Sequence, residues 1–243
     1  MTALHLADEG EAADLAAFLA RLIHYDRAAA VRLQASGTTL AVFGRPPSFE
    51  VLAIRTARLA KPYEDGLGLT LDVTVSAGEL LESLDEAAAT ATVPAAVTGP
   101  PWAGVLPPRG GWRPEPGLPA LDAVRTAVAA VVAEFRSRID ALAPEGRTRD
   151  ALDGIGREIW SRPVGDTELP VRAAHAAQSL GFLRPARTAS AASPGASASA
   201  SASTSDEAAL RLLSSGAWLR LRTPYGTIAV RKAGLGALDV SVR

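Results

Sequence analysis

The sequence contains no cysteine among its 243 residues. This absence excludes a disulfide framework, thiolate metal sites and cysteine nucleophiles, and it fits a reducing compartment. Charged residues interrupt every apolar run well before the roughly 18 residues that a membrane span needs. The first ten residues carry Asp8 and Glu9 and lack the basic and apolar segments of a secretory signal. We therefore expect a cytoplasmic protein without a membrane segment.

Histidine is scarce and the common catalytic motifs are missing. His5, His24 and His175 are far apart in the sequence and no two of them have a metal-ligand spacing, so we expect no metal and no cofactor. The chain has no P-loop, no dinucleotide-binding glycine fingerprint and no serine nucleophile elbow. No residue can be named as catalytic. A non-enzymatic protein is favoured, although acid and base residues can also converge from distant positions.

Lysine is nearly absent, since Lys61 and Lys232 are the only two among the 25 lysine and arginine residues. Together with the abundance of alanine, this indicates a coding bias, so the number of arginines is not by itself evidence of function. Hydrophobic residues make up 48% and charged residues 21%, which is typical of a globular protein.

The clearest structural pattern lies in residues 28–84. Apolar and polar residues alternate in 31–35, 39–43 and 69–75, which predicts half-buried strands, and residues 49–59 are rich in β-branched groups. Ser76 stands three residues before Glu79, the spacing of a capping box, and predicts a helix over 77–89. Apolar residues at helical spacing predict another helix over 8–23. We expect residues 1–92 to form a helix, a β-meander and a closing helix.

Residues 93–119 are rich in proline and glycine and should form a long irregular loop. Trp102 and Trp112 are costly to leave in water, which indicates that the loop packs along the body. It is either a surface strap anchored by its tryptophans or a lid over a ligand or partner. The candidate binding residues are Trp102, Arg109, Trp112 and Arg113.

The remaining chain divides into a helical segment, a linker and a C-terminal unit. Helical spacing predicts three helices within 120–185, and His175 among alanines reads as a packed or surface residue. Residues 186–205 are almost entirely alanine and serine, which predicts a disordered linker. Within 206–243 we expect a short helix over 206–213, a hairpin from 218–222 and 227–232, and a last strand over 238–242. The hairpin should dock on the main sheet, because an isolated hairpin is marginally stable.

Two hairpins resemble each other. Residues 31–42 (VRLQASGTTLAV) and 219–230 (LRLRTPYGTIAV) are identical at five of twelve positions. A duplicated helix-plus-meander unit would explain this likeness. The alternative is that half-buried hairpins in a chain rich in alanine and valine look alike.

The second hairpin has a basic and aromatic outer face. If Leu219 and Leu221 point inward, the alternating residues share the opposite face. Such a face can neutralise phosphates while an indole stacks on a base, or its arginines can simply protect an exposed strand from aggregation. The candidate nucleic-acid residues are Trp218, Arg220, Arg222 and Arg231.

The hairpin followed by LDVTVSAGELLESL resembles the strand-then-helix of sterol-carrier-type lipid-binding modules and one repeat of a DNA sliding clamp. Helices before a basic hairpin are also similar to a winged helix. No diagnostic motif of these families is present, and we assign the chain to none of them.

These patterns together predict an α+β fold with a mostly antiparallel sheet and a layer of three helices. The leading functional hypothesis is a non-enzymatic regulatory or binding protein that acts through protein–protein contacts with an unknown partner. The alternatives are nucleic-acid binding through the second hairpin, or a lipid-like or small-molecule ligand, or catalysis, beneath the loop at 94–113.

Overall fold

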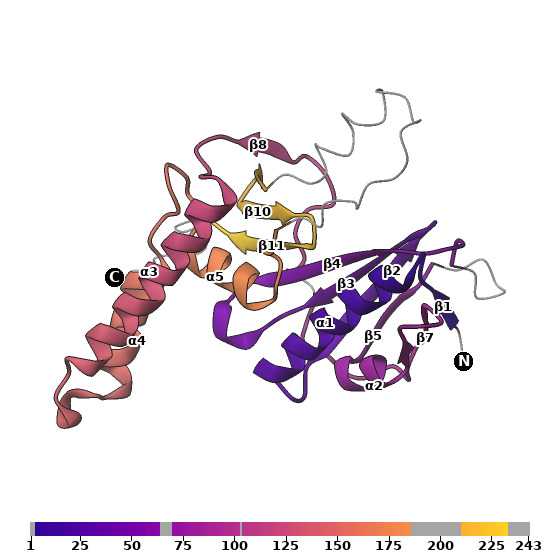
Figure 1. The fold of residues 1–243 in the computed structure, drawn as a ribbon, viewed down its shortest axis with the longest axis horizontal. Coiled ribbons are helices and arrows are strands. Elements are labelled where there is room, and N and C mark those ends of the chain that lie inside the picture. Colours follow the sequence, from indigo (N-terminus) through magenta and orange to yellow (C-terminus); the bar gives the residue numbers. More distant parts are fainter. Residues whose placement is uncertain (1–2, 64–69, 103, 186–209, 233–243) are drawn as a thin grey trace, which may run out of the picture.

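The fold is built on one antiparallel sheet of eight strands, which confirms the α+β prediction (Figure 1). The computed structural model describes residues 3–63, 70–102, 104–185 and 210–232. Along the sheet the strands are ordered β5-β2-β3-β4-β11-β10-β9-β8. The first four lie within residues 30–76 and the last four within residues 113–231, so an N-terminal and a C-terminal part of the sequence share one sheet.

The N-terminal half forms a helix and a meander, as expected. Helix α1 (Glu9–Tyr25) begins at Asp8, whose carboxylate accepts a hydrogen bond from the Glu11 amide, a standard N-cap. Its apolar side packs on the sheet formed by β2 (Ala30–Ser36), β3 (Thr39–Gly44), β4 (Leu52–Arg58) and β5 (Asp72–Ser76). The short helix η1 (Pro47–Phe49) joins β3 to β4. Alternate residues of β2 are buried, as the alternation predicted.

The C-terminal hairpin docks on the main sheet, as predicted. Strands β10 (Trp218–Thr223) and β11 (Gly226–Arg231) pair with each other, and β11 pairs with β4. The helix expected over 206–213 is wrong for residues 211–213, which lie in strand β9 (Arg211–Ser215). Backbone bonding to β10 and burial of Leu212 outweigh a helical preference of so short a segment.

Two further expectations need correction. The helix expected over 77–89 ends early: α2 spans Ala77–Glu82, and the Ser83 hydroxyl then donates to the carbonyls of Leu80 and Thr92. The chain continues as β6 (Leu84–Asp85) and β7 (Thr90–Thr92), which form a small sheet with β1 (Ala3–His5). The proline-rich loop also contains a regular element, strand β8 (Arg113–Glu115), at the edge of the large sheet. A proline is tolerated there because an edge strand need not donate outward.

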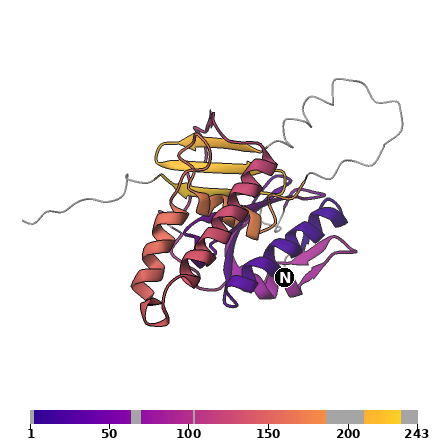
Figure 2. The ribbon, with the colours of Figure 1, turned by 60° about the vertical axis from the view of Figure 1, so that its left-hand side comes forward.

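The helical segment has the three predicted helices, α3 (Leu121–Asp140), α4 (Arg149–Trp160) and α5 (Val171–Ser179), with the short turn η2 (Pro144–Gly146) between the first two. Helix α5 packs on the same face of the sheet as α1, and α3 packs on α5. Figures 1 and 2 show α3 and α4 side by side, extending beyond the sheet as an arm. In the described part of the chain no helix is long and apolar enough to cross a bilayer.

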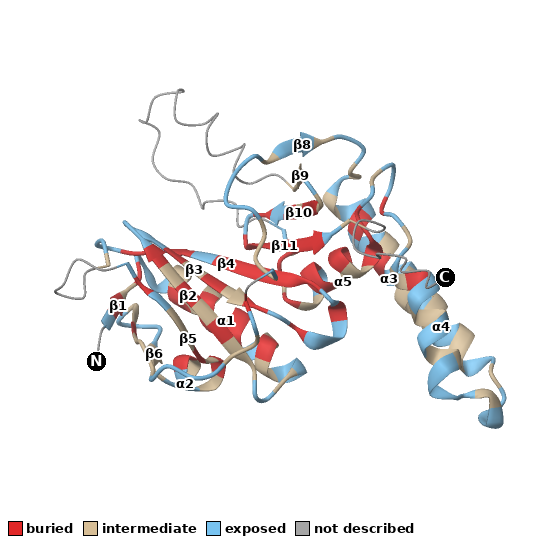
Figure 3. Ribbon diagram, turned by 180° about the vertical axis from the view of Figure 1, so that it is seen from behind, coloured by how far each residue is buried: buried red, intermediate tan, exposed pale blue. Residues whose placement is uncertain are grey.

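The main core therefore lies between the sheet and helices α1 and α5. Figure 3 shows the buried residues concentrated on β4, β11 and the neighbouring helices, while the arm is largely exposed. The linker over 186–205 and the strand over 238–242 lie outside the described residues. The duplication stays a prediction, but strand β9 rather than a helix comes directly before the second hairpin.

Candidate functional site: the outer face of the sheet

The face of the sheet opposite α1 and α5, which we call the outer face, carries a second hydrophobic cluster. Trp102 from the long loop packs here with Trp218 from β10, so the structure brings two predicted sites together. The Trp102 indole N–H donates to the Thr74 hydroxyl at 3.0 Å, which fixes the loop on the sheet. The cluster consists of Leu52, Ile54, Trp102, Trp218 and Ala229, with Phe43, Val105, Leu106 and Trp112 packed against it.

The register of the hairpin places the four predicted residues of β10 and β11 on this outer face. Trp218 stands opposite Arg231, while Arg220 and Arg222 alternate with it along β10. The Trp218 side chain is covered, because the residue is only 9% exposed and the Arg231 guanidinium lies 4.8 Å from its ring centroid. Arg231 also donates to the Gly104 carbonyl. This indole and this arginine are thus already engaged within the molecule.

Arg220 and Arg222, which we call the outer arginine pair, lie two residues apart on the outer face of β10. Within the described residues neither makes an ion pair, and the Arg220 Nε is buried without a hydrogen-bond acceptor. The Arg220 guanidinium lies 5.3 Å from the Trp112 ring centroid. Burial, and secondarily the neighbouring Arg222 charge, lowers the pKa of Arg220. Arg220 is thus a partly desolvated positive charge, Arg222 beside it is exposed, and neither has a counterion in the part of the chain that we describe.

The loop residues divide between the two faces of the sheet. Trp112 is held by its indole N–H, which donates to the Pro108 carbonyl at 3.0 Å, and it supports Arg220. Arg109 is exposed and lies near Asp72, whose pKa is lowered mainly by its hydrogen bond to Arg32. Arg113 of β8 stands opposite Ser214 of β9, which in turn stands opposite Leu219 of β10. The register therefore places Arg113 on the inner face of the sheet, with Leu219. The loop site of four residues is therefore not one site.

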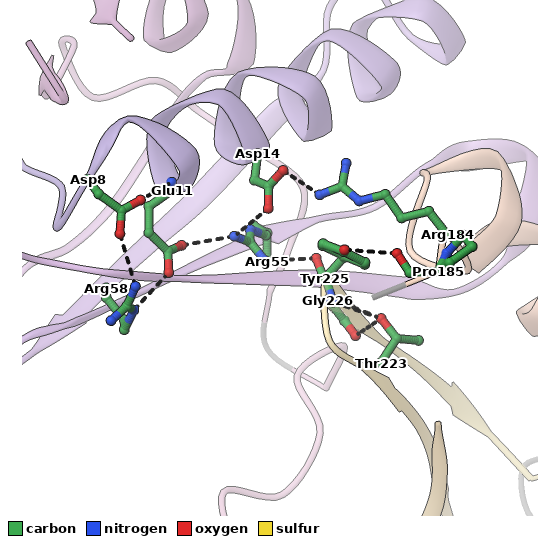
Figure 4. A network of polar contacts seen from close by, with 10 residues as sticks. All are labelled: Asp8, Glu11, Asp14, Arg55, Arg58, Arg184, Pro185, Thr223, Tyr225 and Gly226. Carbon is green, nitrogen blue, oxygen red and sulfur yellow. Dashed lines mark hydrogen bonds and ion pairs between the residues drawn. The ribbon is translucent and has the colours of Figure 1, made fainter. Parts of the chain in front are cut away.

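A buried ionic network joins the two halves of the sheet (Figure 4). Arg55 of β4 is only 6% exposed, and it donates to the Glu11 carboxylate at 2.9 Å and to the Tyr225 carbonyl at 3.0 Å. It also pairs with Asp14, which binds Arg184 as well. Burial lowers the pKa of Arg55, and the Glu11 and Asp14 charges oppose this effect. Sequence analysis missed this network, although an arginine within the apolar strand Leu52–Arg58 was a detectable signal.

A second feature that sequence analysis missed is a chain of aromatic contacts near the base of the arm. The His175 ring stacks on Trp160 of α4 with centroids 4.8 Å apart, and meets the Phe49 ring edge-on at 5.2 Å. Burial lowers the pKa of His175. The described residues contain no group of histidine, aspartate and glutamate side chains that could hold a metal ion. The contacts of the His175 ring with Trp160 and Phe49 show a packed residue, which is one of the two interpretations that the sequence offered.

These features define an α+β protein whose eight-stranded sheet is built by two regions of the chain, which an ionic network joins. The chain belongs to the family described as Domain of unknown function (DUF8185), whose model matches residues 107–235. Residues 1–104 match a second family model, Domain of unknown function (DUF8010). No curated protein and no solved structure matches the chain. The boundary between the two matches falls in the long loop that crosses the outer face.

Proposed function

We propose that this protein is a non-enzymatic binding protein that engages an acidic segment of a partner protein through the outer arginine pair. The proposal rests on one observation: among the described residues, neither Arg220 nor Arg222 forms an ion pair with a carboxylate, and the Arg220 Nε is buried without a hydrogen-bond acceptor. Leaving a desolvated charge without hydrogen-bond partners is costly, so an incoming carboxylate would gain more here than at a fully solvated arginine. Guanidinium groups also match carboxylates in bidentate geometry.

The surroundings of the pair favour a protein partner over nucleic acid. Stacking on a base requires an accessible aromatic ring, but Trp218 is covered by Arg231 and Trp112 lies against Arg220. The chain carries a formal net charge of −1, which gives little long-range attraction for a polyanion. A short acidic segment can bind to two cations beside an apolar surface. Arg220 and Arg222 supply the cations, and the Trp112 ring supplies the apolar surface.

The proposal is tested by fluorescence anisotropy with a labelled ten-residue peptide that alternates glutamate and leucine. The comparison ligands are the same peptide with glutamine in place of glutamate, and a single-stranded DNA. We expect saturable binding of the acidic peptide at low salt, and at least about tenfold weaker binding for Arg220→Gln with Arg222→Gln, a loss of about 1.4 kcal/mol.

The matched control is Arg136→Gln with Arg157→Gln, which removes two exposed arginines of the arm and should leave binding unchanged. Absence of peptide binding, or equal loss in both double variants, would contradict the proposal. Binding of DNA in preference to the peptide, lost in the Arg220 and Arg222 variant, would support the nucleic-acid alternative instead.

A further inference from the structure

A groove of about 460 Å³ lies on the other side of the molecule, between α3 and the chain that leaves α5. Its mouth is open to solvent, and its wall combines two arginines with small and apolar groups. It belongs to the helical layer on the inner face of the sheet, so it is separate from the outer arginine pair. The lining residues are Asp122, Arg125, Thr126, Ala129, Gln178, Gly181, Leu183 and Arg184.

The charge in this groove is positive. Arg125 is 46% exposed, and its nearest carboxylate is that of Asp122 at 3.6 Å, itself almost fully exposed, so this pair is weak. Arg184 is anchored at one end by Asp14 and lies 3.7 Å from the centroid of the Tyr225 ring. Its Nε is buried and has no hydrogen-bond acceptor among the described residues. Two arginines therefore line one groove, together with the weakly held carboxylate of Asp122.

A third arginine, Arg21, lies close to Gly181 of the groove lining. Gly181 has a φ of +77°, which favours glycine, and a side chain there would meet the Arg21 guanidinium at 2.9 Å. The close approach of Arg21 thus depends on the glycine that ends the turn after α5. Gln178 and Thr126 supply neutral hydrogen-bonding groups, while Leu183 and Ala129 supply apolar surface.

We propose that this groove binds a small organic oxyanion with an apolar body, such as a phosphate monoester or a carboxylate. Its volume lies within the range of about 300–1,000 Å³ typical of small-molecule sites, and its lining has the usual mixture of apolar surface and a few polar groups. Planar guanidinium groups bind phosphate and carboxylate oxygens through paired N–H donors. The apolar body would lie on Leu183 and Ala129.

The groove is also connected to the network that joins the two halves of the sheet. Arg184 binds Asp14, and Asp14 binds Arg55, which reaches the turn of the second hairpin. A ligand that holds Arg184 in place would stabilise the folded state by mass action. Ligand binding should therefore raise the midpoint of thermal unfolding as well as produce a binding signal.

Isothermal titration with three probes separates the contributions. Phenyl phosphate carries both the oxyanion and the apolar body, phenol carries only the ring, and inorganic phosphate carries only the anion. We expect saturable binding of phenyl phosphate, roughly tenfold or more weaker binding of inorganic phosphate, and none of phenol. Arg125→Gln should weaken phenyl phosphate binding about tenfold, because Arg125 is exposed and its loss should not unfold the protein.

Two further variants of α3 make the test specific. Ala129→Trp should fill the groove and abolish binding, whereas Arg136→Gln, on the same helix but outside the groove, should leave it unchanged. The proposal fails if phenyl phosphate does not bind at millimolar concentration. It also fails if Arg125→Gln and Arg136→Gln weaken binding equally, or if Ala129→Trp binds like the wild type while remaining folded by circular dichroism.

Discussion

At the scale of single residues, the folded chain places charged and titratable groups in environments that their sequence neighbours do not reveal. Arg55 is an example, since its carboxylate partners Glu11 and Asp14 lie 44 and 41 residues away, and its carbonyl partner Tyr225 lies 170 residues away. The sequence shows an arginine in an apolar strand, but not where its partners are. The outer face of β10 could be predicted, because alternation alone assigns Arg220 and Arg222 to it.

His175 gives a prediction about pH at this scale. Its ring is packed against Trp160 and Phe49. Charged neighbours of His175 and Phe49 in the sequence are Arg172 of helix α5 and Glu50 beside η1, which form a long ion pair at 4.0 Å. Because burial lowers the pKa of His175, the unfolded chain binds a proton more readily than the folded one. The stability that follows is fully present above the unfolded pKa of about 6.5 and is lost as the pH falls below it.

We therefore expect the free energy of unfolding to decrease between pH 7.5 and pH 5 in urea titrations, and His175→Phe to reduce this decrease. His24→Gln, which changes an exposed histidine, is the control and should keep the wild-type dependence. A pH profile for His175→Phe identical to that of the wild type would show that the packing does not depend on the neutral imidazole.

At the scale of secondary-structure elements, periodicity was a good guide wherever an element has one buried face. It predicted α1, α3, α4 and the strands of the first meander, because their apolar spacing repeats over at least two turns or several alternations. Periodicity was wrong for residues 211–213, which belong to the five-residue strand β9. So short a segment carries too little pattern, and its hydrogen bonding to β10 and β8 decides its conformation. The small sheet of β1, β6 and β7 was not predicted for the same reason.

The joint between β4 and β11 is where elements from the two halves meet. Only three residue pairs register across it, so we expect the Arg55 network to contribute to holding it together. Replacing Arg55 by Met leaves Glu11 and Asp14 without their shared buried cation, which should destabilise the protein by on the order of 3 kcal/mol. Arg58 also binds Glu11 but is 70% exposed, so Arg58→Met should cost no more than about 1 kcal/mol.

Urea unfolding of the two variants measures this difference directly. A further comparison is Arg55→Met combined with Glu11→Gln and Asp14→Asn, which should recover part of the loss because the two carboxylates that lost the buried Arg55 cation are neutralised together. Equal, small effects of Arg55→Met and Arg58→Met would mean that the buried network does not stabilise the joint between the halves.

At the scale of the whole molecule, the two matched families form one structure instead of two separate folds. The sheet continues from β4 to β11, and the loop between the two family matches crosses the outer face and packs on both halves. Sequence patterns could indicate that the C-terminal hairpin docks on the sheet. They could not indicate which edge it uses, because the meander has two edge strands, β4 and β5, of similar sequence pattern.

The covering of the outer face also could not be predicted. Trp102 and Trp218 were each recognised as aromatic residues of interest, but only the fold shows that they fill one cluster. This contact removes Trp218 from the exposed surface, while beside it on β10 Arg220 is half-buried and Arg222 is exposed. The functional proposal therefore depends on tertiary structure more than on any motif.

The most direct test of the account is amide hydrogen exchange with and without the alternating glutamate and leucine peptide. We predict slower exchange in β10, at residues 218–223, and in the neighbouring turn at 109–112, with little change in the arm formed by α3 and α4. Protection that appears only in the arm or around the groove at Arg125 and Arg184 would contradict the account, because the peptide would then bind elsewhere than on the outer arginine pair.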